Sequence, residues 1–306
     1  MRGSWPARRR SPLLARYTRH VRSTAALLVL FSLTIACSSP QRATMRDDLG
    51  RQVPVPKPVR RVVTLAPNLT EIIFDIGTGS KIVATDSFSD TPAAVRALPK
   101  VGGVPPNVER IVAAHPDLAV TVSSSGDHAL GSALAAANVP LYVVRTDRIA
   151  DIPRAMETLG RILDARDAGR VAAALRGAID AQRRLRPRPP RVVFLIWTDP
   201  LYVAGHDTFA DDLLSLAGAH NVVAAKGWPQ YSLESLVADP PDLLLYPEKS
   251  VKAAAVETLF RAAPELRSRS TAVAVDENLF TRPGPRLVHA AEELNAILDR
   301  WEVVRH

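Results

Sequence analysis

Aromatic side chains gather in the second half of the chain, although only 5% of all residues are aromatic. Three of them, Trp197, Trp228 and Phe280, fall at or after the ends of predicted strands or in loops. Such positions face a cleft rather than the core of an α/β fold, although packing beneath loops is the alternative. Aromatic rings bury a large apolar area at a small entropic cost, so together they could bind a flat hydrophobic macrocycle. The aromatic residues of the second half considered for this role are Trp197, Tyr202, Phe209, Trp228, Tyr231 and Phe280.

A polar segment near the end of the chain offers hydrogen-bonding groups of both charges. The stretch DENLFTRPGPR, residues 276–286, places Asp276, Arg282 and Arg286 after the last predicted strand. In a cleft, such groups could bind the amide or carboxylate edges of a ligand, and the planar guanidinium group suits planar partners. A surface ion pair is the alternative interpretation.

Signatures of catalysis are missing from the sequence. There is no GxSxG elbow, no GxxxxGK[ST] loop, no HExxH and no GxGxxG after a strand. The histidines are scattered, and the single cysteine excludes a multi-thiolate site, so we predict no metal site and no cofactor. His128 and His206 lie in loops where either could be an axial ligand to the metal of a bound haem or corrin. We therefore predict a binding protein; a chelatase-like or reductase-like enzyme would need a metal or nucleophile cluster in the cleft.

The elements that must position these groups follow the pattern of parallel α/β units, in which short β-rich runs alternate with longer helical ones. Residues 149–185 read as a single helix of more than thirty residues, about 50 Å long, before RPRPP stops it. We expect two Rossmann-like α/β lobes with parallel sheets, residues 59–147 and 188–306, joined by a long rigid backbone helix at residues 148–187. The predicted strands are 61–66, 82–86, 118–123 and 141–145 in the first lobe, and 191–197, 242–247 and 271–276 in the second.

The two halves of the chain repeat each other. NVERIVAAHPDLAV at residues 107–120 and SLESLVADPPDLLL from Ser232 share six identities in fourteen positions, including a glutamate at the same place. An earlier helix in each half is expected to begin at a capping residue, Asn68 in one and Thr208 in the other. Two similar lobes would form a cleft between the ends of their strands, where ligands bind in open α/β sheets.

The N-terminus has the composition of a targeting segment. Residues 1–36 contain seven arginines and no acid, and they end in the apolar run TAALLVLFSLTIA, which is typical of a signal-peptide core. The rest of the chain carries 32 basic and 31 acidic side chains, which argues against a nucleic-acid partner. We predict a signal peptide at residues 1–36, followed by a polar, proline-containing tether at residues 37–58.

Five ordered stretches resemble the substrate-binding lipoproteins of ABC importers for cobalamin, ferric siderophores and haem. They are RRVVTLAPNLTEIIF, FSDTPAAV, NVERIVAAHPDLAV, WPQYSLESLVADPPDLLL and RPGPRLVHAAEELNAIL. The resemblance spans residues 59–299 and implies a monomer that holds its ligand between two lobes with little hinge motion. It also implies delivery to a permease dimer with ATPase subunits, and a diacylated Cys37 that anchors the protein to a membrane in the cell envelope.

Within this family the cobalamin-binding members are the most similar. Their motifs carry ligand contacts over to Trp228 and Phe88, and their late polar pair over to Asp276 and Arg282. A further cleft tryptophan is absent, because Gly103 or Val104 stands in its place, and this keeps haem or a ferric siderophore open as the ligand. The predicted ligand contacts are Pro67, Asn68, Phe88, Trp197, Tyr202, Trp228, Asp276, Phe280 and Arg282.

The matched glutamates, Glu109 and Glu234, correspond in this resemblance to surface residues that pair with arginines on the two permease subunits. Each lies early in a predicted helix, where the helix dipole favours a carboxylate; that placement alone is the simpler explanation. Two symmetric ion pairs would fix the orientation of docking.

Overall fold

The computed structural model describes residues 41–123 and 128–305. The predicted signal peptide and Cys37 lie outside the described residues. Within the described ranges, no helix is both long and apolar enough to cross a membrane.

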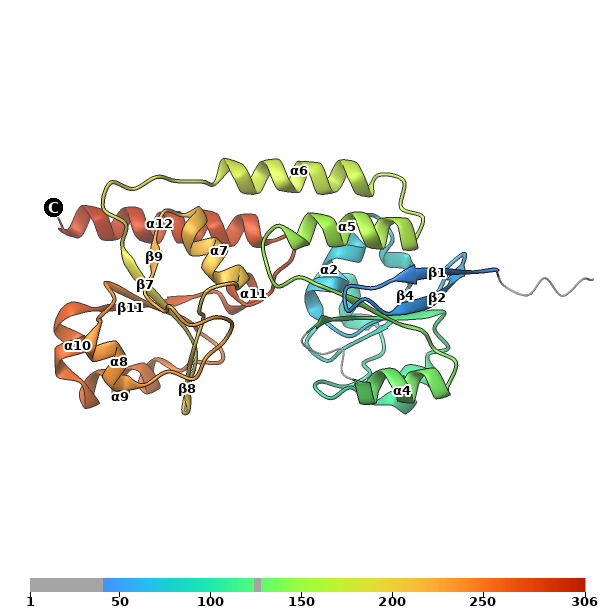
Figure 1. The fold of residues 1–306 in the computed structure, drawn as a ribbon, viewed down its shortest axis with the longest axis horizontal. Coiled ribbons are helices and arrows are strands. Elements are labelled where there is room, and N and C mark those ends of the chain that lie inside the picture. Colours follow the sequence, from blue (N-terminus) through green and yellow to red (C-terminus); the bar gives the residue numbers. More distant parts are fainter. Residues whose placement is uncertain (1–40, 124–127, 306) are drawn as a thin grey trace, which may run out of the picture. The chain divides into compact units, whose positions relative to one another are not determined.

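The first lobe, called the N-lobe here, is built on a four-stranded parallel sheet (Figure 1). Its strands are β4 (Ile82–Thr85), β3 (Val62–Thr64), β5 (Leu118–Val122) and β6 (Leu141–Val144), in that spatial order. They are short apolar runs that are almost entirely buried, as expected when helices cover both faces of a parallel sheet. The helices are α2 (Pro67–Asp75), α3 (Val108–Ala113) and α4 (His128–Ala136), with the 3-10 turns η1 (Gly79–Lys81) and η2 (Ala93–Ala97).

The second lobe, the C-lobe, has the strand order β11 (Thr271–Val275), β10 (Leu243–Pro247), β7 (Arg191–Thr198) and β8 (Leu201–Val203), with β9 (His220–Asn221) also paired to β7. All of these pairings are parallel except that of β7 with β8. Every predicted strand is confirmed to within a few residues, whereas β8 was not predicted. The helices are α7 (Phe209–Leu216), α8 (Leu233–Ala238), α9 (Ala253–Ala262), α10 (Pro264–Arg269), α11 (Glu277–Phe280) and α12 (Leu287–Arg305).

The two predicted helix caps have opposite outcomes. Thr208 caps α7 as expected, because its hydroxyl accepts a hydrogen bond from the backbone N–H of Asp211. The prediction for Asn68 is wrong: the cap position of α2 is Ala66, the helix begins at Pro67, and Asn68 is a buried residue inside the helix. Proline suits a first helical position because its fixed φ is already helical and its missing N–H has no partner to lose.

The prediction of one continuous backbone helix is also wrong. The segment forms two packed helices, α5 (Asp151–Ile162) and α6 (Ala168–Ala181). Asp164 takes a left-handed φ of 54°, and the N–H of Ala165 donates to the carbonyl of Gly160 at 2.9 Å, which is the hydrogen bond of a Schellman C-cap. The chain then reverses closely, since a Cβ on Gly160 would lie 2.2 Å from that of Ala168.

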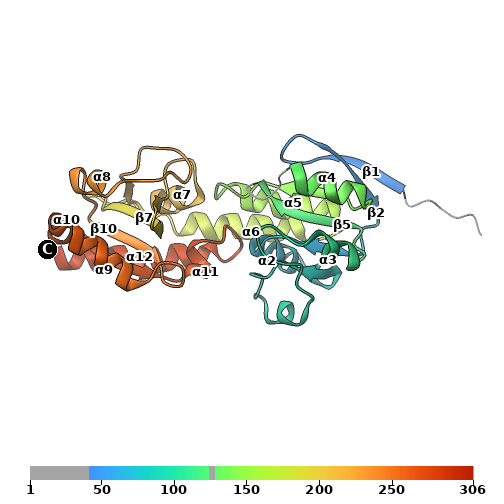
Figure 2. The same cartoon turned by 90° about the horizontal axis from the view of Figure 1, so that it is seen from below.

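Helix α6 connects the lobes. It lies beside α5, which packs on α2 of the N-lobe, and it also contacts α12 of the C-lobe (Figures 1 and 2). With 14 residues it is about 21 Å long at 1.5 Å per residue. The link between the lobes is therefore a layer of packed helices rather than an isolated rod.

The predicted tether is in large part folded, so that prediction is corrected for residues 41–57. Strands β1 (Gln41–Arg46) and β2 (Gln52–Lys57) form a two-stranded sheet. In β2 the residues alternate, so that Val53 and Val55 enter the core. The Tyr142 hydroxyl donates to the carbonyl of Arg46 at 2.8 Å. The hairpin is thus attached to β6 of the N-lobe.

The repeat seen in the sequence recurs as a repeated structural device. The Asp117 carboxylate, just before β5, accepts hydrogen bonds from the backbone N–H groups of Arg60 and Arg61 at 2.7 and 2.9 Å. Asp242, just before β10, accepts one from the N–H of Arg191 at 2.9 Å. In each lobe, the aspartate at the equivalent position of the repeat therefore links the end of a helix-to-strand connection to the start of the neighbouring strand by hydrogen bonds. This shared feature supports the interpretation of duplicated lobes.

Candidate functional site

A cavity of about 770 Å³ lies between the two lobes. The N-lobe lines it with residues that follow the carboxyl ends of its strands, and the C-lobe with the start of α7, the segment before α8 and the loop after α11. This volume falls within the range of small-molecule sites, and strand ends are where open α/β sheets bind ligands. The lining residues are Leu65, Ala66, Pro67, Asn68, Phe88, Val104, Val122, Ser123, Thr146, Asp147, Asp207, Thr208, Phe209, Gly227, Trp228, Glu277, Thr281, Arg282 and Pro283.

Two exposed rings face this cavity from opposite lobes. Trp228 is 42% exposed and packs against Phe209 of α7, with ring centroids 5.7 Å apart. Phe88 is 55% exposed, and a Cβ built on Gly103 would lie 3.3 Å from its ring. The Phe88 ring therefore rests against the backbone of Gly103. Both rings are presented to a ligand by a close supporting contact.

Five of the predicted ligand contacts line the cavity: Pro67, Asn68, Phe88, Trp228 and Arg282. The Asn68 side chain is buried, and its amide donates to the Thr146 hydroxyl at 3.0 Å and to the carbonyl of Pro283 at 3.1 Å. Its donors therefore join the N-lobe to the C-lobe at the cavity wall.

The remaining predicted contacts lie elsewhere. Trp197 and Tyr202 are paired in register on the β7–β8 hairpin, exposed but outside the cavity lining. Asp276 caps α11, where its carboxylate accepts a hydrogen bond from the N–H of Asn278 at 2.7 Å. The expectation that Phe280 faces the cleft is wrong, because Phe280 is 2% exposed and packs in the core with its ring 6.2 Å from that of Phe194. The short helix α11 turns this side chain inward.

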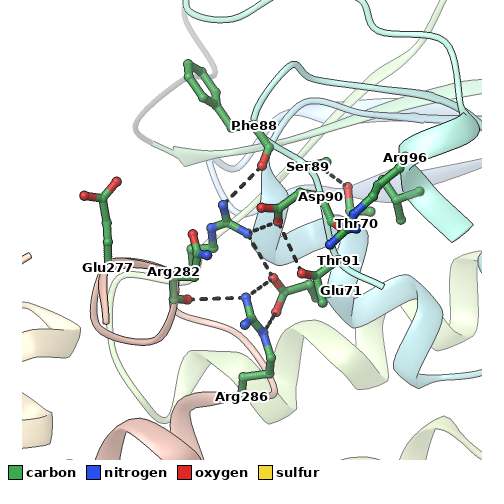
Figure 3. Close-up of polar contacts among 12 residues, drawn as sticks. Thr70, Glu71, Phe88, Ser89, Asp90, Thr91, Arg96, Glu277, Arg282 and Arg286 are labelled. Carbon is green, nitrogen blue, oxygen red and sulfur yellow. Dashed lines mark hydrogen bonds and ion pairs between the residues drawn. The ribbon is translucent and has the colours of Figure 1, made fainter. Parts of the chain in front are cut away.

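Arginines of the C-lobe pair with carboxylates of the N-lobe beside the cavity (Figure 3). Arg286 donates to both oxygens of Glu71, at 2.9 and 2.7 Å. Arg282 donates to Asp90 at 2.7 Å and to the carbonyl of Phe88 at 3.2 Å. Partial burial alone would raise the pKa of Asp90, but the hydrogen bond and charge of Arg282 bring it below its ordinary value. The hydrogen bond to Glu71 raises the pKa of Arg286.

A second set of inter-lobe ion pairs centres on Arg148, between β6 and α5. Its guanidinium pairs with the Asp212 carboxylate on α7, its Nε donating at 2.9 Å, and it reaches Asp207 at 3.2 Å. The backbone N–H of Ile149 also donates to Asp212 at 2.9 Å. The hydrogen bond to Asp212 raises the pKa of Arg148. With the Glu71 cluster, these contacts fix the two lobes to each other through residues far apart in the sequence.

Glu109 and Glu234 occupy equivalent places in the two lobes. Both are exposed second residues of six-residue helices, α3 and α8. The caps are equivalent too, because Asn107 accepts from the N–H of Arg110 and Ser232 from the N–H of Ser235. Hydrogen bonds from a backbone N–H and from Ser232 lower the pKa of Glu234, so its carboxylate is charged at neutral pH.

Sequence reasoning missed three acidic residues of the cavity lining: Asp147, Asp207 and Glu277. Asp147 could have been found, because it closely follows a predicted strand and so belongs at the edge of the sheet where ligands bind. The histidines that were considered, His128 and His206, are not among the lining residues. No group of three or more His, Cys, Asp or Glu side chains suited to a metal ion occurs within residues 41–123 and 128–305.

Two α/β lobes with parallel sheets, joined by packed helices around a shared cavity, define a bilobal solute-binding protein. The sequence matches the periplasmic binding protein family over residues 62–276, and the chain belongs to this family. A vitamin B12-binding protein of Pectobacterium atrosepticum is 27% identical over 248 residues, covering 77% of this chain and 87% of that protein. An uncharacterized ABC transporter substrate-binding lipoprotein of Bacillus subtilis is 28% identical over 301 residues, covering 88% of this chain and 94% of that protein.

Solved structures agree with this assignment. The apo form of a periplasmic heme-binding protein from Roseiflexus sp. RS-1 has a TM-score of 0.70 and 26% identity, covering 78% of this chain and 97% of that one. The chain is a substrate-binding protein of an ABC importer, with a permease as partner and a small molecule as ligand. Because the members of this family are binding proteins, the chain is a binding protein and not an enzyme.

Proposed function

We propose that this protein captures a corrinoid, cobalamin being the leading candidate, between its lobes outside the cytoplasm and delivers it to the permease of an ABC importer. The observation that carries the proposal is the pair of exposed rings, Trp228 and Phe88, on opposite walls of one cavity. Such rings suit a large, flat and mainly apolar macrocycle. The relatives named as vitamin B12-binding proteins, which align with most of this chain, support the same ligand.

Haem is the second candidate, and a ferric siderophore the third. A haem is also flat, and the structural neighbour from Roseiflexus is described as a periplasmic heme-binding protein. However, an axial ligand from His128 or His206 has no support, because neither residue lines the cavity. The corrinoid is therefore preferred.

The ligand is tested by isothermal titration of the protein from residue 41 onward with cyanocobalamin, haemin and ferric siderophores. We expect saturable binding of cyanocobalamin at one site. Binding of only haemin or only a siderophore would reject the corrinoid proposal. Haemin binding that shifts its Soret band, with a shift lost in His206→Ala, would support the haem candidate instead.

We further propose that Glu109 and Glu234 are the docking points for the two permease subunits. Their support is the repeated geometry: both are exposed and each follows an equivalent side-chain cap. In Glu109→Lys/Glu234→Lys, we expect loss of ligand uptake and of binding to the permease, with ligand affinity unchanged. Glu157→Lys, at a partly exposed position of α5 and away from α3 and α8, is the matched control. A large loss of ligand affinity in the double variant would show that these glutamates have another role.

Anchoring through a diacylated Cys37 is proposed for the cell-envelope location. The apolar run before Cys37 and the similarity to a lipoprotein of Bacillus subtilis support it. With Cys37→Ser we expect the protein to leave the membrane fraction and the detergent phase. Unchanged membrane association of that variant would refute the anchor.

A further inference from the structure

We propose that the inter-lobe cavity selects by charge: it takes a neutral or cationic, amide-bearing chelate and discriminates against ligands that carry carboxylates on their periphery. This inference rests on the proposed function, since it assumes that the cavity is the ligand site, and it names the chemical class that the site accepts.

The first observation concerns Arg282, whose guanidinium already has partners within the protein. Among the described residues that line the cavity, Arg282 is the only Lys, Arg or His. Its side chain is 14% exposed, and its guanidinium serves the Asp90 carboxylate at 2.7 Å, the Phe88 carbonyl at 3.2 Å and Glu71 at 3.5 Å. A ligand carboxylate would have to displace these partners, which are held by the contact between the lobes.

The second observation is that three acids, Asp147, Asp207 and Glu277, line the same cavity. Asp207 is paired with Lys226 at 2.7 Å and with Arg148 at 3.2 Å. The hydrogen bond and charge of Lys226 lower the pKa of Asp207, so it is a carboxylate at neutral pH. Its cationic partners are both engaged and do not line the cavity.

The other two acids have hydroxyl or amide partners rather than cations. Both oxygens of Asp147 are 3.1 Å from the Ser123 hydroxyl. One oxygen of Glu277, Oε2, accepts from the N–H and hydroxyl of Ser250 at 2.5 and 2.6 Å. Within the described part of the chain, neither carboxylate is in an ion pair with Lys, Arg or His. One comes from each lobe, so both sides of the cavity carry negative charge.

The consequence follows from elementary electrostatics. Unit charges a few ångströms apart at a protein surface interact by more than thermal energy, so a ligand carboxylate placed here is repelled. An amide N–H can instead donate to Oε1 of Glu277, or to an Asp147 oxygen, which can accept a further bond beside that from Ser123; both would be charge-assisted hydrogen bonds. Corrins carry peripheral amides, haem carries propionates, and ferric tris-catecholates are anions. The cavity therefore favours the first class.

The test compares two ligands of nearly the same shape. Cyanocobalamin is titrated against a derivative in which a peripheral amide has been hydrolysed to a carboxylate. We expect the acid to bind about tenfold or more weakly at low ionic strength, and the ratio to shrink as salt screens the repulsion. In Asp147→Asn/Glu277→Gln the ratio should fall toward one. Asp167→Asn, an exposed acid beside α6, should keep the wild-type ratio.

The outcomes separate the two proposals. Equal affinity for the amide and acid forms, or an unchanged ratio in the double variant, overturns the charge selection and leaves the corrinoid function standing. Binding of haemin or of an anionic ferric catecholate in place of both corrinoids overturns both proposals.

Discussion

The ion-pair cluster around Glu71 should stabilise the contact between the lobes, and Glu71→Gln tests this. The Glu71 side chain is 6% exposed and receives two hydrogen bonds from Arg286, which is itself 28% exposed. Removing one partner of a buried pair costs about 3–5 kcal/mol, because the remaining charge is left uncompensated. Glutamine keeps an acceptor oxygen and Arg286 is partly solvated, so we expect a loss of about 2 kcal/mol.

The assay is thermal unfolding followed by circular dichroism at neutral pH. A loss of about 2 kcal/mol lowers Tm by roughly 4–8 °C for a chain of this size. Glu157→Gln is the matched control, because Glu157 forms an exposed pair with Arg176 at 3.5 Å and such pairs contribute about 0–1 kcal/mol. Combining Glu71→Gln with Arg286→Met should cost less than the sum of the single changes. A Tm of Glu71→Gln within about 1 °C of wild type would refute this account of the inter-lobe contact.

Three further expectations separate core, cavity and inter-lobe roles. Phe280→Ala should lose about 3–5 kcal/mol of stability, because the ring packs on Phe194 in the core, yet the folded protein should keep its corrinoid affinity. Trp228→Ala should lose about tenfold or more in corrinoid affinity, measured by titration, with little change in the Tm measured by thermal unfolding. A loss of affinity in Phe280→Ala without a loss of stability would contradict the assignment of Phe280 to the core. Asp90→Asn should be less stable than wild type above about pH 5, because a pKa lowered by Arg282 in the folded state stabilises that state wherever the carboxyl is ionised. That difference should vanish on acidification through the lowered pKa, and a difference that grows instead would contradict the ion pair.

Much of the fold could be predicted because its signals are local. Each strand that was predicted is a short, mainly apolar run, and the repeated Pro-Asp-Leu at the starts of β5 and β10 marks equivalent positions in the two lobes. The hairpin of β1 and β2 also had a signal, the alternation QVPVPK, which its prolines obscured. The end of α5 was missed because it depends on the left-handed backbone conformation of Asp164. The apolar periodicity does not register that conformation, so it predicts a helix that extends past this residue.

The candidate site could be predicted only in part, because its geometry depends on contacts that are distant in the chain. Glu71 and Arg286 are 215 residues apart, and no local pattern pairs them. Phe280 ends a four-residue helix, which is too short for a 3.6-residue period to show which side is buried. Arg282, a predicted ligand contact, lines the cavity, but the partners that occupy its guanidinium come from the other lobe and could not be read from its own segment.

The two walls of the cavity differ, although the starts of α3 and α8 on the two lobes are equivalent. At the spacing of 125 residues that matches Glu109 to Glu234, Gly103 corresponds to Trp228. The N-lobe has no side chain there, and the ring of Phe88, from a different loop, packs against the bare backbone. Each lobe therefore presents one exposed ring to the cavity, but from non-equivalent positions of the repeat. A partner with two similar subunits would favour keeping the helix starts alike, whereas an asymmetric ligand imposes no such constraint on the walls. Equivalence within the repeat therefore relates Glu109 to Glu234, but it does not relate the two exposed rings, Phe88 and Trp228.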